Sequence, residues 1–200
     1  MKRFICRLLV ALPLVACTLA PEAALAGSSI ASDTIRINVN ASIAERCGVA
    51  AIGARTNEGG RIDLPTQVAF NFRLDCNTPF KIGVAAQNGA LRMTSAASDI
   101  RELDGFGISK QYKVGLSFMT DQDGLVDAGI CDSEKLSAAD PECVFYGAAP
   151  GSGFSPGRHT TAIGREGSLV VRWAGEGREP RRLAAGAYQE TITIVVGPRM

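Results

Sequence analysis

Residues 70–86, FNFRLDCNTPFKIGVAA, decide the fold class of this chain. Apolar side chains occupy every second position on both sides of an Asn-Thr-Pro turn at residues 77–79. A two-residue period is typical of a β-strand with one buried face, and the turn residues favour a reversal of the chain. We therefore expect two strands here, paired as a hairpin.

The same alternation recurs along the chain, and no stretch has a sustained helical period. About six strands without a helix predict an all-β, antiparallel sandwich. Residues 90–110 and 125–167 lack a period and are expected to be long loop insertions. Outside the opening stretch, the predicted strands cover Ile35–Ile43 with Cys47 continuing its inward face, Tyr112–Phe118, Leu169–Trp173 and Tyr188–Val196.

The N-terminus has the pattern of a secretory signal peptide. Lys2, Arg3 and Arg7 precede an apolar run at 8–20, and small residues follow at 24–26. The run is shorter than a bilayer span and Pro13 interrupts it, so we expect no transmembrane anchor. Residues 1–26 are thus expected to be removed, and residues 27–200 to form one domain.

A second processing route stays open at the same end of the chain. Leu14-Val15-Ala16-Cys17 resembles a lipobox, in which Cys17 would be lipidated and become the first mature residue.

The charge balance argues against two classes of partner. The full chain has 21 basic and 20 acidic residues. The expected signal peptide contains three of the basic and one of the acidic residues, so residues 27–200 have a net charge of about −1. We therefore expect neither nucleic acid nor an anionic membrane surface as a partner.

Four cysteines remain outside the leader: Cys47, Cys76, Cys131 and Cys143. An even number in an exported chain predicts disulfides. Three pairings are possible, and proximity in sequence with a similar local setting favours Cys47–Cys76 and Cys131–Cys143. A zinc site is the alternative, but the chain has no C-x-x-C and one histidine, so we expect no metal and no cofactor.

Two motifs could carry chemistry, and each has a simpler interpretation. Residues 153–157 match the G-x-S-x-G nucleophile elbow, but Pro156 follows Ser155 and the surroundings are predicted loop, so we expect a turn. Asp121, Asp123 and Asp127 could suggest calcium. The twelfth loop position is Asp132 rather than Glu, which favours an Asp-Gly turn. We expect no catalytic residues and no enzyme.

Three features then occur in a particular order. A strand ends at Cys47, a second ends at Cys76 before the segment PFKIGV at 79–84, and the chain finishes with LAAGAYQETITI at 183–194. This order resembles the spore coat protein U family and the related subunits of archaic chaperone-usher pili. The match is strongest at residues 34–86 and 183–196. Glu190 stands where that family has Asp, and the middle of this chain is longer and has an additional cysteine pair.

The resemblance implies an immunoglobulin-like sandwich that lacks its last strand, with a disulfide between the first two strands. A periplasmic chaperone and then the N-terminal segment of a neighbouring subunit would fill the open groove, with assembly at an outer-membrane usher. We expect no room for a further strand between Val196 and Met200. The candidate donor residues, within 27–39, are Ile30, Ile35, Ile37 and Val39.

The predicted function is therefore a structural or adhesive subunit that self-associates by strand donation. Its expected location is the periplasm and then the cell surface. The alternative is a stand-alone surface binding domain, secreted or lipid-anchored, that never polymerises. That alternative predicts that residues 90–167 fold over the groove.

Overall fold

The computed structural model describes residues 38–56, 60–94, 106–175 and 181–200. The chain divides into a unit up to Ala41 and a compact unit from Ser42 to Met200. Residues 38–41 of the first unit are exposed and form no helix or strand. The predicted signal peptide with Cys17, and the donor candidates Ile30, Ile35 and Ile37, lie outside the described residues.

Nearly all the regular secondary structure of the described part of the compact unit is β-strand, as the alternation predicted. The one helix of the described residues is a single short turn that the sequence did not predict. The elements in chain order are β1 Cys47–Ile52, β2 Thr66–Cys76, β3 Phe80–Ala86, β4 Leu91–Met93, β5 Phe106–Gly107, β6 Ser109–Lys110, β7 Lys113–Met119, β8 Leu125–Asp132, α1 Ser133–Ser137, β9 Ala162–Trp173, β10 Arg182–Leu183, β11 Tyr188–Gln189 and β12 Ile192–Pro198.

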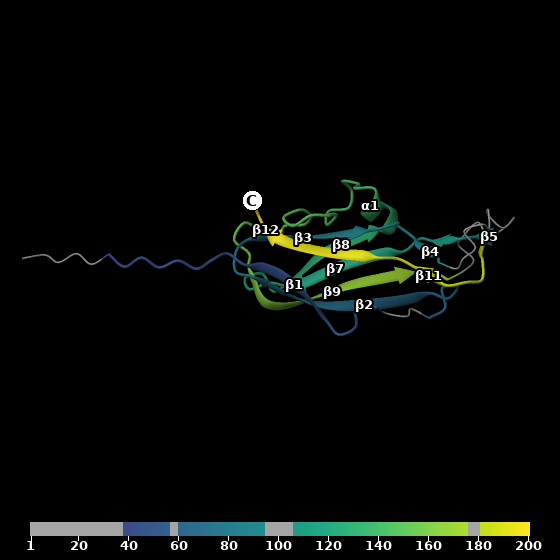
Figure 1. Cartoon of the computed structure of the whole chain (residues 1–200), viewed down its shortest axis with the longest axis horizontal. Helices are drawn as coiled ribbons and strands as arrows, with labels where there is room; N and C mark the ends of the chain where they lie inside the picture. Colours follow the sequence, from purple (N-terminus) through teal and green to yellow (C-terminus); the bar gives the residue numbers. More distant parts are fainter. Residues whose placement is uncertain (1–37, 57–59, 95–105, 176–180) are drawn as a thin grey trace, which may run out of the picture. The chain divides into compact units, whose positions relative to one another are not determined.

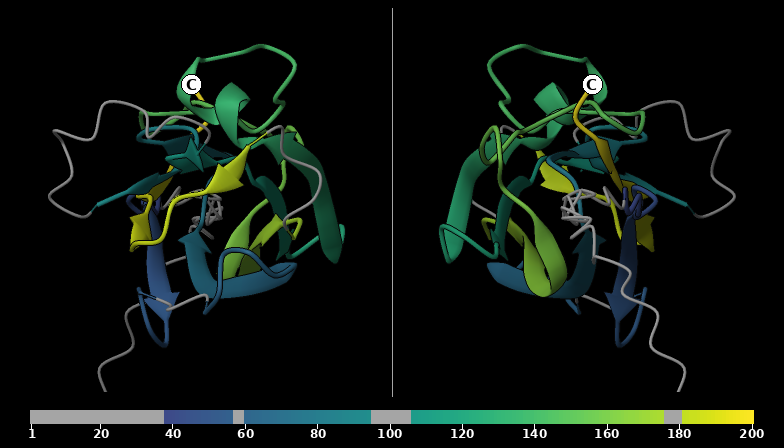
Figure 2. Two further views of the ribbon diagram at one scale, coloured as in Figure 1. Left: turned by 90° about the vertical axis from the view of Figure 1, so that its right-hand side faces the viewer. Right: turned by 90° about the vertical axis from the view of Figure 1, so that its left-hand side faces the viewer.

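Two antiparallel sheets carry most of the structure (Figures 1 and 2). The larger has the strand order β1-β2-β9-β7-β8, and the second consists of β12 and β3. Two small sheets, β11-β4-β6 and the parallel pair β10-β5, lie outside these. β2 and β3 therefore belong to different sheets.

The expected hairpin at residues 70–86 is wrong. β2 pairs with β1 and β9, whereas β3 pairs with β12 from Phe80↔Pro198 to Ala86↔Ile192. Both strands have a buried apolar face, and such faces are covered by stacking sheet on sheet. The turn at 77–79 accordingly carries the chain from one sheet to the other instead of reversing it within one.

The predicted first strand, Ile35–Ile43, is also wrong where it can be checked. Residues 38–46 form no strand, and β1 begins only at Cys47. Val39 and Ile43 are 85% and 88% exposed. Alternation gives a segment a tendency to extend, but a strand also needs a neighbour to pair with.

Asn77 fixes the chain just before β1. Its side chain accepts a hydrogen bond from Arg46 N at 2.8 Å and donates one to Ala44 O at 3.0 Å. Its own N–H donates to Arg46 O at 3.1 Å. Arg46 also forms an ion pair with Asp75. The main chain is thus held from Ala44 onward.

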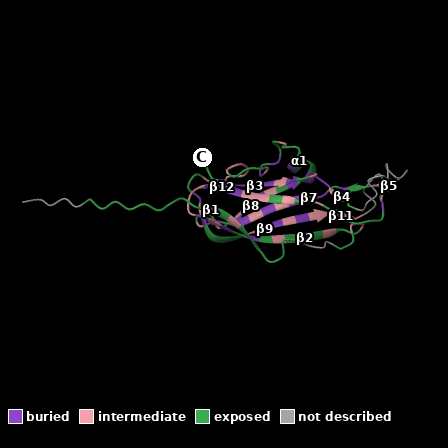
Figure 3. Ribbon diagram, viewed as in Figure 1, coloured by how far each residue is buried: buried purple, intermediate pink, exposed green. Residues whose placement is uncertain are grey.

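One hydrophobic core joins the inner faces of the two main sheets (Figure 3). Fully buried aromatic rings lie at its centre, with Phe80 and Phe118 packed at a centroid distance of 5.9 Å. Among its other members are Phe72, Leu74, Ile82, Val84, Val114, Leu116, Leu169 and Val196.

The two disulfides are those that proximity favoured. Cys47 and Cys76 stand directly opposite each other in the β1–β2 ladder, so their bond fastens an otherwise exposed edge strand. Cys131, at the end of β8, is bonded to Cys143 in the loop beyond α1. Two disulfides fit an exported protein, because such bonds persist in oxidising compartments.

The stretch 125–167 is more ordered than its sequence predicted. It contains β8, α1 and the first half of β9, and its middle lies against β3. We call residues 145–154 the edge segment. Ile82 exchanges two main-chain hydrogen bonds with Phe154, both 2.9 Å, and Val84 N donates to Phe145 O while Val84 O accepts from Gly147 N.

Glycines permit this close approach. A Cβ on Gly83 would lie 2.7 Å from Gly147 Cα, and one on Gly153 would lie 2.3 Å from Ile82 O. Gly153 also has a φ of 96°, which favours glycine. The edge segment therefore occupies the side of β3 that faces away from β12.

Candidate functional site

The outer side of β12 is an unpaired strand edge. Within the described residues, β12 pairs with β3 alone. The hydrogen bond from Gln87 N to Thr191 O shows which residues of the last strand direct their main-chain groups to β3. Because antiparallel pairs alternate, Thr193 and Val195 direct their main-chain groups to β3. Those of Ile192, Ile194 and Val196 point the other way.

The side chains of the same three residues face the core. Val196 is buried, whereas Ile192 and Ile194 are half-buried. Each residue therefore has main-chain groups without a ladder partner and an apolar side chain beside them. This combination is what an added β-strand uses.

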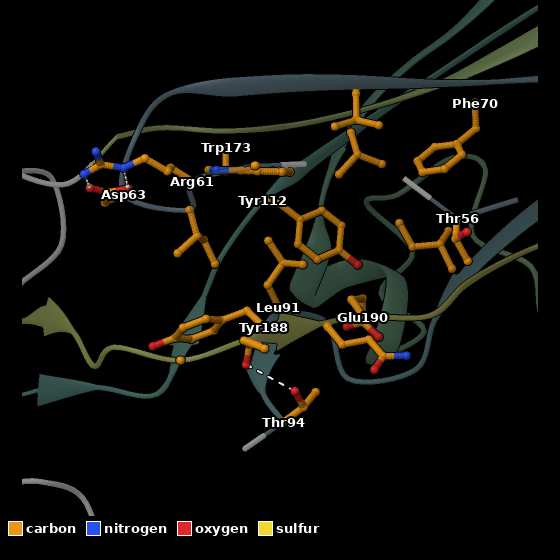
Figure 4. A pocket seen from close by; sticks show the side chains of 18 of the residues that line it. Thr56, Arg61, Asp63, Phe70, Leu91, Thr94, Tyr112, Trp173, Tyr188 and Glu190 are labelled. Atoms are coloured by element: carbon orange, nitrogen blue, oxygen red, sulfur yellow. Dashed lines mark hydrogen bonds and ion pairs between the residues drawn. The ribbon is translucent and has the colours of Figure 1, made fainter. Parts of the chain in front are cut away.

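A groove of about 900 Å³ opens beside the start of β12 (Figure 4). Its walls come from the β1–β2 loop, β2, β4, β9 and the segment through β11 to Ile192. Phe70, Leu91, Trp173 and Ile192 line it and are only half-buried. Apolar core residues are thus left partly uncovered at this end of the molecule.

Polar groups surround the groove. Arg61 and Asp63 form an ion pair on the β1–β2 loop, and Figure 4 shows them beside Trp173. Thr94 and Glu190 lie on the opposite wall. The rim therefore carries both signs of charge.

Glu190 holds the turn after β3 against the start of β12. Its carboxylate accepts hydrogen bonds from the main-chain N–H groups of Asn88, Ala90 and Thr191, at 2.7 to 3.2 Å. The Asn88 side chain donates a further bond at 3.3 Å. Charge-assisted bonds of this kind are about twice as strong as neutral ones, so Glu190 has a clear structural role.

Tyr188 fixes the approach to the last strand. Its hydroxyl donates to Ala184 O, four residues upstream, at 2.7 Å. Tyr188 and Trp173 are half-buried and line the groove as well. Trp173 does pack against the core cluster.

Two polar atoms of the groove wall are buried and have no hydrogen-bond partner within the described part of the chain. They are Tyr112 Oη and Trp173 Nε1. Tyr112 is 3% exposed. Burial raises the pKa of its phenol, and the Glu190 carboxylate raises this pKa further. The hydroxyl is therefore a neutral donor near a negative charge.

The G-x-S-x-G motif does not form a nucleophile elbow. Residues 153–157 join no strand to a helix, and His159 is exposed. Ser155 Oγ accepts a hydrogen bond from Arg199 Nη1 at 3.2 Å. Ser155 and His159 thus have none of the geometry that hydrolysis needs.

The three aspartates fix turns. Asp121 accepts from Thr161 Oγ1, Ile163 N and Arg165 Nε, and although burial acts to raise its pKa, these bonds hold the pKa below its usual value. Asp123 accepts from Thr160 and Asp127 from Gly129 N. The described residues contain no group of three or more His, Cys, Asp or Glu side chains that could hold a metal.

No family model matches this chain, and neither does any curated protein. Within the part of the chain that the structure describes, no helix has the length and apolarity to cross a bilayer.

The structure brings together residues that the sequence analysis did not connect. Phe70, Leu91, Tyr112 and Trp173 come from four separate segments and meet in the groove. The alternation predicted strands at Phe70, Tyr112 and Trp173, whereas Leu91 lay in a predicted loop. Nothing in the sequence indicated that these four side chains meet in a groove. Val39, the one donor candidate that the structure describes, is exposed.

Proposed function

We propose that this protein is an exported structural or adhesive subunit whose sandwich is completed by a β-strand from another polypeptide. The assembly would be of the spore coat protein U or archaic chaperone-usher pilin type. The observation that carries the proposal is the outer edge of β12, which pairs with no described strand and lies beside a groove lined by half-buried apolar side chains.

Strand order supports an immunoglobulin-like sandwich. Constant-type domains have the order A-B-E-D in one sheet and C-F-G in the other. Here β1-β2-β9-β7 takes the A-B-E-D order, and β3 and β12 take the places of C and F. The position of G is the outer side of β12, where no described strand pairs.

Tyr188 gives a second, independent argument. Immunoglobulin-like domains have a tyrosine near the start of strand F whose hydroxyl bonds to the backbone a few residues upstream. Tyr188 precedes β12, the F equivalent, and bonds to Ala184 O. The motif that resembles the pilin family therefore contains a bond typical of this fold.

The candidate occupant is the alternating segment Ile35–Ile43 of a second copy. The described part of this segment pairs with nothing, and Val39 and Ile43 are exposed. An added strand gains main-chain hydrogen bonds along the edge, and its alternate side chains enter the pockets. A periplasmic chaperone and an outer-membrane usher are the further partners that the resemblance implies.

The experiment compares four forms of residues 27–200 by light scattering and thermal melting. The unmodified chain should self-associate. A form with residues 30–44 fused through a flexible linker after Met200, and with the N-terminal segment deleted, should be monomeric and melt at least 10 °C higher than the deleted form alone. The matched control is the same fusion with Ile37→Asp and Val39→Asp, which should not raise the melting temperature.

Equal melting of the two fusions would refute strand completion. A sharply melting monomer of the unmodified chain would refute self-association.

The alternative of a stand-alone binding domain predicted that residues 90–167 fold over the groove. Leu91, Thr94 and Tyr112 form part of its wall, but none of residues 113–167 lines it. The edge segment lies on β3 instead. We therefore favour the polymerising subunit.

A further inference from the structure

Tyr112 is an energetic anomaly in the groove. A buried polar group without a partner costs roughly 1–3 kcal/mol, and the large majority of buried side-chain polar atoms in proteins have one. Among the residues that the structure describes, Tyr112 Oη has no partner, and the indole N–H of Trp173, on the same groove wall, has none either. Both groups can donate, so what the groove lacks is an acceptor.

The nearby acceptor is already engaged. Figure 4 shows the Tyr112 ring among Trp173, Leu91 and Glu190. Main-chain N–H groups of Asn88, Ala90 and Thr191 donate to the two carboxylate oxygens of Glu190. The carboxylate is thereby fixed on the turn after β3, and its interaction with Tyr112 is electrostatic without a hydrogen bond.

We propose that Tyr112 is a specificity-determining residue, and that the strand which fills the groove brings a neutral hydrogen-bond acceptor to Tyr112 Oη. The acceptor is neutral because a second carboxylate near Glu190 would be repelled, and repulsion between like charges is strong where water is excluded. This inference rests on the proposed function and adds a chemical requirement to it.

The candidate occupant meets the requirement. Residues 34–44 contain no Asp or Glu, and the main-chain carbonyls of an extended segment are neutral acceptors. Asn38, Asn40 and Ser42 alternate with the apolar residues, so their side chains become acceptors where the strand turns this polar face toward Tyr112. A segment with an acidic residue at this end of the groove would be rejected.

The test uses residues 27–200, at a concentration where the chain is monomeric, and a fluorescent peptide of residues 34–44 with neutral, blocked ends. Tyr112→Phe should weaken peptide binding about 5- to 10-fold, the loss of one hydrogen bond. It should leave the melting temperature of the free protein unchanged or raised, because the hydroxyl has no partner there.

Tyr188→Phe removes another hydroxyl from the same groove. This hydroxyl is bonded to Ala184 O, so the variant should melt at a lower temperature, whereas Tyr112→Phe should not. The control for binding is Ser155→Ala, which removes a hydroxyl outside the groove lining and should bind the peptide within twofold of the unmodified chain.

Peptides with Asn38→Ala, Asn40→Ala or Ser42→Ala identify the acceptor. The substitution whose effect disappears in Tyr112→Phe marks the bonded side chain. If all three effects persist while Tyr112→Phe still weakens binding, a main-chain carbonyl is the acceptor. Equal affinity of Tyr112→Phe and the unmodified chain would overturn this inference alone. No binding to the unmodified chain would overturn the proposed function with it.

Discussion

The two strands of the second sheet resemble each other, but within the described residues only the outer edge of β3 is covered. β3 and β12 each have seven residues and direct apolar side chains into one core. The outer edge of β3 is covered by the edge segment 145–154, which a disulfide helps to hold. The outer edge of β12 pairs with no described residue.

The difference shows that an unpaired edge is not a general property of this sheet. Unpaired edges invite pairing with other chains, and proteins usually cover or disrupt them. This chain covers β3 with the edge segment, and β8, one edge of the larger sheet, has a bulge at Ala128, opposite Leu116 and Ser117 of β7. β1, the other edge of the larger sheet, pairs with β2 alone among the described strands and is fastened to it by Cys47–Cys76. The proposed function therefore predicts that an incoming strand adds to β12.

The largest expected effect comes from freeing the edge segment. Replacing the disulfide by Cys131→Ala with Cys143→Ala should cost about 3 kcal/mol of unfolding free energy, because the bond closes a loop of roughly 13 residues. Hydrogen exchange at Ile82 and Val84 N–H should accelerate, since these groups bond to the edge segment. Chemical denaturation and exchange measured by NMR check both.

The control for that variant is Cys47→Ala with Cys76→Ala. It should also destabilise the protein but leave Ile82 and Val84 among its slowest amides. Slow exchange at these two positions in the Cys131/Cys143 variant would show that the edge segment does not depend on its disulfide.

Hydrogen exchange in the unmodified protein should distinguish the open edge of β12 from the covered edge of β3. On β12, the N–H groups of Thr193 and Val195 bond to β3, and those of Ile194 and Val196 face the open side. We expect the second pair to exchange at least roughly 100-fold faster, because unpaired amides open without breaking the ladder. On β3, neighbouring amides should be equally protected. Uniform protection along β12 would mean that its edge is already closed.

A smaller effect is expected from filling the space between β3 and the edge segment. Gly153→Ala would place a methyl group against Ile82 O and should cost roughly 2 kcal/mol more than Gly53→Ala. Gly53 also has a positive φ, of 82°, but nothing lies within 4 Å of a Cβ there. Comparing the two variants separates steric crowding from backbone strain. Equal losses of unfolding free energy, measured by chemical denaturation, would contradict the close contact at Gly153.

The smallest effect is expected at Ser155. Its hydroxyl accepts a hydrogen bond from exposed Arg199, so Ser155→Ala should change the unfolding free energy by less than about 0.5 kcal/mol. Assembly should be unchanged too. A loss of assembly would give this loop a role in strand addition.

The sequence predicted the parts of the fold that depend on local pattern. Alternation located β2, β3 and β7 and the last strand, and proximity favoured both disulfides. Alternation could not predict which strands pair. Residues 70–86 have the pattern of a hairpin, although their two halves belong to facing sheets. Ile35–Ile43 has the strongest alternation, yet its described residues form no strand, because a buried-face pattern does not specify which chain supplies the burial.

The candidate site was harder to predict than the fold. The missing strand was an expectation from the resemblance, whereas the groove depends on where the second sheet ends. Glu190 and Tyr188 belong to the motif that suggested the family, but their hydrogen bonds cross to residues 88–90 and 184. Nothing in the sequence distinguished Tyr112, because its unusual feature is a buried hydroxyl without a hydrogen-bond partner among the described residues.

The Asn77 hydrogen bonds to Ala44 and Arg46 fix the length of the linker before β1. Residue 43 directly precedes this fixed point, and each extended residue spans only about 3.3 Å. A second domain that binds residues 35–43 as a strand would therefore lie within a residue or two of this domain. Successive domains of such a polymer would have almost no flexible linker between them, so the polymer would be stiff without lateral contacts.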